Sequence, residues 1–173
     1  LRLYYLALAA RPGYALAYYN IGNVYANQGR MAEAEMNFRR ALESWPDYAD
    51  ARVNLANTIA ERGDTADAIL QYQRALRSSA AQPKAHNNLA NALMRQGKTA
   101  EAIEQYRRAI AIKPDFAEAC NNLANAFAET GRLDEAVVLY RRAIEIQPDF
   151  PAAAGNLKRA LDRQAQLNRD GAR

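Results

Sequence analysis

The chain has 173 residues, of which 50% are hydrophobic and 24% are charged, with a formal net charge of +4 and a single cysteine. So small a charge does not indicate a nucleic-acid partner, and one cysteine excludes an internal disulfide framework. No apolar run approaches the roughly 18 residues that a membrane-spanning helix needs, so we expect this fragment to contact neither nucleic acid nor membrane.

Similar residues recur every 34 positions along the whole chain. When units are counted from Ala15, the fifteenth position is always glycine, namely Gly29, Gly63, Gly97 and Gly131. The eighth position is always small and the twenty-fourth always aromatic. A fixed period of this length indicates one supersecondary unit stacked on copies of itself.

Residues 1–14 align with the end of a unit, so we expect them to form the second helix of a truncated preceding repeat. We therefore expect the chain to be a fragment of a longer protein. Four full units follow, over 15–48, 49–82, 83–116 and 117–150. In each unit, apolar residues spaced by three and four on both sides of the glycine predict two amphipathic helices. The glycine fits a helix end that needs a left-handed residue.

Residues 151–165 are predicted to form a C-terminal capping helix, because Lys158 occupies the small eighth position and blocks a further helix. Residues 166–173 read as a polar tail that is expected to fray.

Proline followed by aspartate closes three of the four units, and we expect Asp47 and Asp115 to cap the helices that follow. The second unit departs from this pattern, because Ser78, Ser79 and Ala80 replace the proline. A looser turn is predicted there.

The pattern Tyr18-x2-Ile21-Gly22-x2-Tyr25, followed by Ala34-x3-Phe38 and Pro46, resembles the tetratricopeptide repeat (TPR) family. The resemblance covers roughly residues 4 to 161. It implies an all-α fold, a right-handed superhelical solenoid of stacked antiparallel helix pairs, in which the first helix of each pair lines the concave wall.

Asparagine fills two positions on the first helix of nearly every unit. The sixth position holds Asn20, Asn54, Asn88, Asn122 and Asn156, and the ninth holds Asn23, Asn57, Asn91 and Asn125. Residues three apart share a helix face, and this face lies opposite the second helix. A carboxamide has donors and an acceptor that match a peptide unit, so this asparagine ladder predicts a groove that binds an extended polypeptide through its backbone.

A structural interpretation stays open beside this one, in which the asparagines only bond between adjacent helices or persist from duplication. Tyr19 is the tyrosine best placed to face the groove. Asn23, Asn54 and Lys84 offer part of a clamp for a terminal carboxylate, but the fifth position lacks the lysine that such a clamp needs. A carboxylate clamp is therefore disfavoured.

Within the TPR family, the strings 121–126 and 141–148 are most similar to repeats of O-linked N-acetylglucosamine transferases. In that group an asparagine ladder holds acceptor polypeptides by the backbone, and the resemblance implies the same use here.

No catalytic constellation, cofactor motif or metal-ligand spacing is visible. His86 and Cys120 are interpreted as packing residues. Paired arginines on the second helices favour a solvated convex face, with an RNA- or lipid-binding stripe as a minor alternative.

Three functions follow from these patterns: a non-enzymatic scaffold that binds an extended peptide, a substrate-presenting arm of a larger enzyme such as a glycosyltransferase, or a self-associating scaffold. Self-association is expected through the apolar N-terminal helix. We expect a cytoplasmic location, or the soluble part of a membrane-anchored parent.

Overall fold

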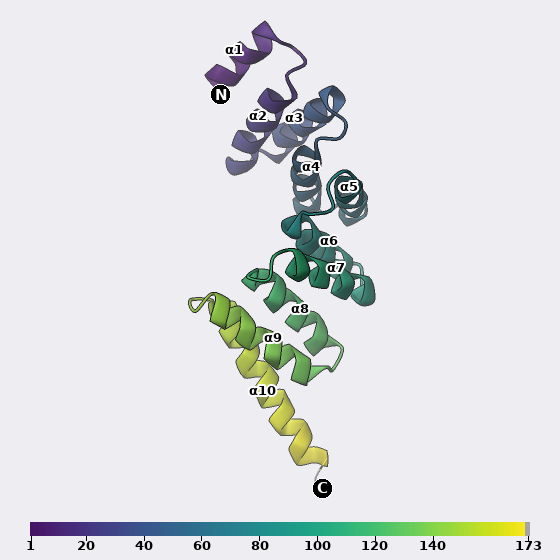
Figure 1. Ribbon diagram of the computed structural model, residues 1–173, viewed down its shortest axis with the longest axis vertical. Coiled ribbons are helices and arrows are strands. Elements are labelled where there is room, and N and C mark those ends of the chain that lie inside the picture. The colour runs from purple at the N-terminus through teal and green to yellow at the C-terminus, as the bar shows by residue number, and fades with distance from the viewer. Residues whose placement is uncertain (172–173) are drawn as a thin grey trace.

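Ten α-helices make up almost all of residues 1–171, the part of the chain that the computed structural model describes (Figure 1). Their bounds are α1 (Arg2–Ala10), α2 (Ala15–Asn27), α3 (Met31–Ser44), α4 (Ala49–Glu61), α5 (Thr65–Ser78), α6 (Pro83–Arg95), α7 (Thr99–Ile112), α8 (Ala117–Glu129), α9 (Leu133–Ile146) and α10 (Pro151–Gly171). This part of the chain contains no β-strand. The predicted all-α class is confirmed.

The helices form antiparallel pairs that stack into an elongated superhelix with the two termini at opposite ends (Figure 1). Each helix packs against helices one or two places away along the chain, as α2 does against α3 and α4. The core is accordingly a continuous seam and has no single centre. It runs from Ala34 in α3 to Ala160 in α10.

The turn within each pair depends on the repeated glycine. Gly29, Gly63, Gly97 and Gly131 have φ values of 73°, 93°, 73° and 79°, a left-handed conformation that costs side-chain-bearing residues free energy. The next residue then closes the helix end, as when the Arg30 N–H donates to the Tyr25 carbonyl at 2.9 Å. The prediction of a left-handed residue at this position is confirmed.

The predicted aspartate caps are wrong. The N-cap residues of α4 and α8 are Tyr48 and Phe116, and neither makes a side-chain cap hydrogen bond. The Tyr48 and Phe116 N–H groups instead donate to the Trp45 and Lys113 carbonyls, at 3.1 and 3.2 Å. Each aspartate therefore lies one residue before the N-cap position. Burial of Phe116, which is only 8% exposed, stabilises this arrangement through the hydrophobic effect.

The capping helix is longer than predicted, because α10 continues from residue 165 to Gly171. Residues 166–171 are thus helical, and 172–173 lie outside the described residues. This stretch contains no proline, and Gln166 donates to Asp170 one turn later at 3.0 Å, which supports the extra turns.

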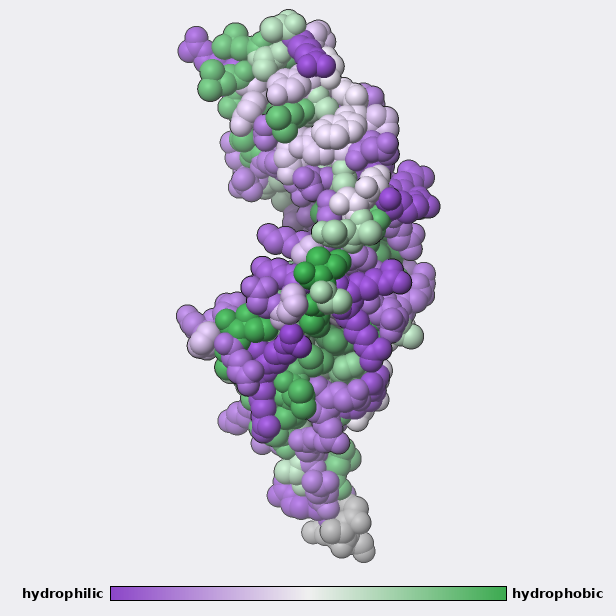
Figure 2. All heavy atoms as spheres, viewed as in Figure 1, coloured by the Kyte–Doolittle hydropathy of each residue, from purple (hydrophilic) through white to green (hydrophobic). Residues whose placement is uncertain are grey.

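Hydrophobic residues gather on the surface at the N-terminal end (Figure 2), where Leu3 and Leu6 of α1 are 79% and 58% exposed. No helix among residues 1–171 is both long and apolar enough to span a membrane.

Candidate asparagine ladder and groove

Four of the five sixth-position asparagines, all but Asn20, bond to the unit before them. Each side-chain amide nitrogen donates to the ninth-position carbonyl oxygen of the preceding unit: Asn54 to Asn23 at 2.7 Å, Asn88 to Asn57 at 2.9 Å, Asn122 to Asn91 at 3.3 Å and Asn156 to Asn125 at 2.9 Å. The inter-helix bonds that the structural interpretation requires are therefore present, so part of the ladder holds adjacent units together.

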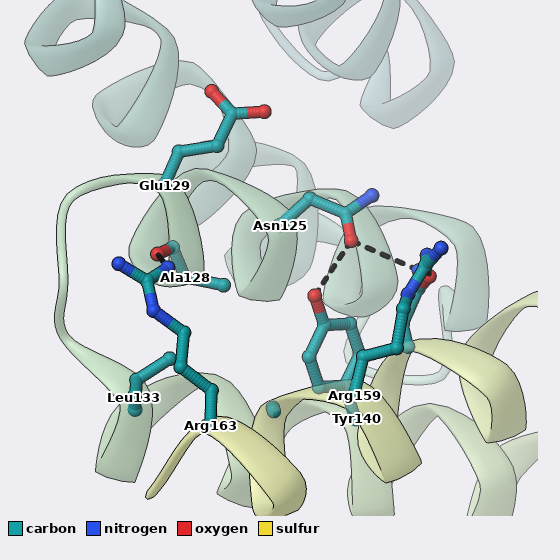
Figure 3. A pocket seen from close by; sticks show the side chains of 9 residues that line it. Asn125, Ala128, Glu129, Leu133, Tyr140, Arg159 and Arg163 are labelled. Carbon is teal, nitrogen blue, oxygen red and sulfur yellow. Dashed lines mark hydrogen bonds between the residues drawn. The ribbon is translucent and has the colours of Figure 1, made fainter. Parts of the chain in front are cut away.

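The ninth-position carbonyls accept a second hydrogen bond from the aromatic twenty-fourth position of their own unit. The hydroxyls of Tyr72, Tyr106 and Tyr140 donate to Asn57, Asn91 and Asn125 at 2.6, 2.6 and 2.7 Å. Figure 3 shows Asn125 accepting from Tyr140 while it also bonds to α10. Both lone pairs of each of these carbonyls are then used. The first unit lacks this bond because Phe38 replaces the tyrosine.

Burial raises the pKa of the Tyr72, Tyr106 and Tyr140 hydroxyls above the ordinary value near 10. These hydroxyls therefore stay protonated and remain donors throughout the neutral range.

The other half of each ninth-position carboxamide is free. Among residues 1–171, the amide nitrogens of Asn23, Asn57, Asn91 and Asn125 have no hydrogen-bond partner, and their side chains are partly exposed. In Figure 3 the Asn125 nitrogen points away from Tyr140. In all but Asn23 the carbonyl end is held by two bonds, so the orientation of the NH₂ group is fixed as well.

Tyr19, Asn54 and Lys84 come together in one groove pocket of about 440 Å³. Val53 and Phe116 line its apolar part, and Asp50 and Lys113 also reach it. Tyr19 is held by ring contacts with Tyr48 and Phe38, at centroid distances of 5.0 and 6.1 Å. The pocket thus joins three first helices in one apolar hollow with two ammonium groups.

Four of these pocket residues, Asp50, Val53, Lys113 and Phe116, were not predicted from the sequence. The sequence held a signal for Asp50 and Val53, because the second and fifth positions of the units vary while neighbouring positions repeat. The second position holds Leu16, Asp50, Lys84 and Glu118, and the fifth holds Tyr19, Val53, Asn87 and Asn121. Variable positions beside repeated ones are expected where a scaffold selects a ligand.

The ladder ends at α10 in a charged pocket of about 360 Å³ (Figure 3). Arg159 takes the ninth position and bonds to Asn156, and Arg163 donates to the Ala128 carbonyl at 3.1 Å. Glu129 faces the same hollow. This end of the groove was not predicted, because the asparagine pattern stops within α10.

His86 and Cys120 are buried, with 4% and 0% of their surface exposed. The His86 ring nitrogens lie 2.8 Å from Gln105 Oε1 and 3.0 Å from the Ala80 carbonyl. Burial raises the pKa of the Cys120 thiol, which makes it a poor nucleophile. Both contribute to packing.

A stack of antiparallel helix pairs that contact only their neighbours defines the class of helical-repeat proteins. The chain belongs to the tetratricopeptide repeat family, because family models described as "Tetratricopeptide repeat" match residues 13–81 and 87–151. A comparison with curated protein sequences finds no significant match.

Solved TPR structures share this fold. MamA is 26% identical, with a TM-score of 0.77 over 85% of this chain and 86% of that one. YrrB, described as "a TPR protein with an unusual peptide-binding site", is 27% identical, with a TM-score of 0.75 over 90% and 80%. PilF of Pseudomonas aeruginosa has a TM-score of 0.82 over 91% and 72%, but at 23% identity it shows the fold alone. The similarity to O-linked N-acetylglucosamine transferase repeats stays a prediction.

Proposed function

We propose that the chain is a non-enzymatic protein-interaction scaffold that binds an extended peptide segment in its concave groove. The observation that carries this proposal is the row of free, oriented NH₂ groups at the ninth position of the first helices. Donors that are already oriented lose little conformational entropy when a ligand binds.

The hydrogen-bond pattern narrows what the groove recognises. The carbonyl ends of Asn57, Asn91 and Asn125 are already occupied, so the ladder offers donors and would bind the carbonyl groups of a peptide. First helices lie about 10 Å apart and an extended chain advances about 3.3 Å per residue. Each unit would therefore meet about every third carbonyl of the partner.

The Tyr19–Asn54–Lys84 pocket would select particular side chains of the bound peptide near the N-terminal end of the asparagine row. Val53 and Phe116 favour an apolar side chain, while Lys84 and Lys113 favour a nearby carboxylate. The likeness to YrrB supports the same class of ligand here. We therefore expect the preferred segment to combine an apolar and an acidic residue.

The test removes the donors and keeps the internal bonds. In the triple variant Asn57→Asp, Asn91→Asp, Asn125→Asp, one oxygen still accepts from tyrosine and asparagine, but the NH₂ group is lost. Binding to a display library of extended peptides of about 12 residues, enough to span four units, should weaken at least tenfold. The unfolding temperature should change little.

Two controls separate the effects of charge and of structure. Gln28→Glu, Gln73→Glu and Gln96→Glu together add the same charge at exposed sites outside the ladder and should leave peptide binding unchanged. Asn54→Ala, Asn88→Ala and Asn122→Ala together remove inter-unit bonds and should lower stability. Unchanged peptide binding in the aspartate variant would show that the ladder is purely structural.

A further inference from the structure

A second hollow, separate from the groove, lies where α4 begins and α5 ends. It has a volume of about 650 Å³ and is lined by Asp47, Arg52, Arg74, Arg77 and Ser78. Three guanidinium groups face one carboxylate, so the lining carries a formal charge of +2. All five residues belong to the second unit or to the loop that leads into it.

The three arginines of this hollow have no salt-bridge partner within the described part of the chain. Arg30, Arg39 and Arg107 each form a salt bridge with a glutamate one turn away. Among residues 1–171, no carboxylate oxygen lies within 4.0 Å of Arg52, Arg74 or Arg77.

The hydrogen bonds inside the hollow leave its net positive charge in place. Arg52 donates to the Pro46 carbonyl at 2.5 Å and to Gln71 Oε1 at 3.4 Å, both neutral acceptors. Asp47 accepts from the Ser78 hydroxyl at 3.5 Å. Burial lowers the pKa of the Arg52 guanidinium. The charges of Arg74 and Arg77 lower that pKa further, whereas the Asp47 carboxylate opposes the shift. An anion bound in the hollow would offset this repulsion between like charges.

Only the second unit creates this arrangement. The twenty-sixth position is arginine in every unit, but the fourth holds Tyr18, Arg52, His86 and Cys120, and the twenty-ninth holds Glu43, Arg77, Ala111 and Glu145. In the first and last units a glutamate thus stands where the second unit has Arg77. The second unit is also the one in which serine and alanine replace the closing proline, and its Ser78 lines the hollow.

We propose that this arginine pocket binds a phosphomonoester dianion, the chemistry shared by a phosphorylated serine or threonine side chain and by inorganic phosphate. A phosphomonoester carries a charge of about −2 at neutral pH, which matches the pocket. Guanidinium groups bind phosphate oxygens in pairs through their planar fork, and the Ser78 hydroxyl adds one donor. The lining holds no aromatic ring on which a nucleobase would stack.

The decisive variant is Arg77→Glu, because it introduces the residue that the first and last units already carry at this position. Isothermal titration would use three probes at constant ionic strength: inorganic phosphate, a phosphoserine peptide and the same peptide without phosphate. We expect the parent chain to bind the first two and not the third. Arg77→Glu should weaken both interactions at least tenfold.

A thermal scan without phosphate checks that the variant folds. Arg77→Glu should unfold at the same temperature as the parent or higher, because the substitution removes repulsion. If the arginines serve to bind phosphate, the variant should lose phosphate binding and keep its stability. If they serve to stabilise the fold, the variant should lose stability.

Arg108→Glu is the matched control, because it makes the same change of charge at an exposed arginine of the third unit, outside the arginine pocket. It should bind phosphate as the parent does. Tighter binding of the phosphopeptide than of inorganic phosphate would identify a phosphorylated partner, and equal binding would identify the free anion. The proposal is overturned if the parent binds neither inorganic phosphate nor the phosphoserine peptide, or if Arg108→Glu weakens binding as much as Arg77→Glu.

Discussion

At the scale of the residue, one carboxamide serves two purposes in each unit. The oxygen of Asn57, for example, holds Tyr72 of its own unit and Asn88 of the next, while its nitrogen remains free for a ligand. The asparagine repeat therefore need not be assigned either to stability or to binding, because the two ends of the amide are used differently.

The tyrosine hydroxyls at the ladder predict a loss of stability in alkali. The pKa values of Tyr72, Tyr106 and Tyr140 are raised in the folded chain, whereas in the unfolded chain they ionise near pH 10. The folded state then holds more protons than the unfolded state, so the free energy of unfolding should fall as pH rises above about 10.

The triple variant Tyr72→Phe, Tyr106→Phe, Tyr140→Phe should lose about 1 kcal/mol per site at neutral pH and show a flatter decline in alkali. Urea unfolding at a series of pH values measures both effects. A residual decline is expected from Tyr48, whose pKa burial also raises. An unchanged alkaline slope in the variant would contradict the assignment to these three hydroxyls.

At the scale of the element, helix pairs pack through a small residue at the eighth position. In the first unit this residue is Gly22, and a methyl group added there would lie 2.6 Å from Cε1 of Phe38. The ring has no room to move, since only 1% of its surface is exposed. The other units carry alanine at this position opposite a tyrosine.

Gly22→Ala should therefore destabilise the chain by about 1–3 kcal/mol through overpacking of α2 on α3, which outweighs the ~0.5–1 kcal/mol that alanine contributes to helix stability. Urea unfolding measures the difference. The reverse change in the second unit, Ala56→Gly, is the control and should cost about 1 kcal/mol. A stabilising Gly22→Ala would mean that the ring repacks.

Periodicity was sufficient to predict the helices but not their ends. The 34-residue spacing fixes which faces are apolar, and the glycine fixes the turn, so both follow from local physics. The N-caps and the length of α10 depend instead on a balance between competing local interactions. At α8, for example, burial of Phe116 competes with capping by Asp115, and the spacing of residues in the sequence does not predict which interaction is stronger. The arginine pocket likewise combines Arg52 of α4 with two arginines of α5. These residues are far apart in the sequence, and their proximity becomes visible only in the folded structure.

At the scale of the whole molecule, each unit contacts only its neighbours, and among the described helices α1 contacts α2 alone. Its Leu3 and Leu6 side chains are exposed, and Figure 2 shows hydrophobic surface at this end of the molecule. We expect two copies to cover these faces against each other, since exposed apolar area of this kind drives association.

Sedimentation over a concentration series should show a larger species forming as concentration rises, and Leu3→Glu with Leu6→Glu should abolish it. Leu167→Glu alters an exposed leucine at the opposite end and should leave association unchanged. A parent chain that stays monomeric at millimolar concentration would contradict this expectation.

The two hydrogen bonds at each of the Asn57, Asn91 and Asn125 oxygens have a mechanical consequence. One atom, such as Asn91 Oδ1, links the second helix of its own unit with the first helix of the next, so a force on the attached nitrogen is transmitted to both. A bound polypeptide would thereby stiffen the units on either side of each contact and adjust the pitch of the coil, so that docking at one unit prepares the next for its own contact.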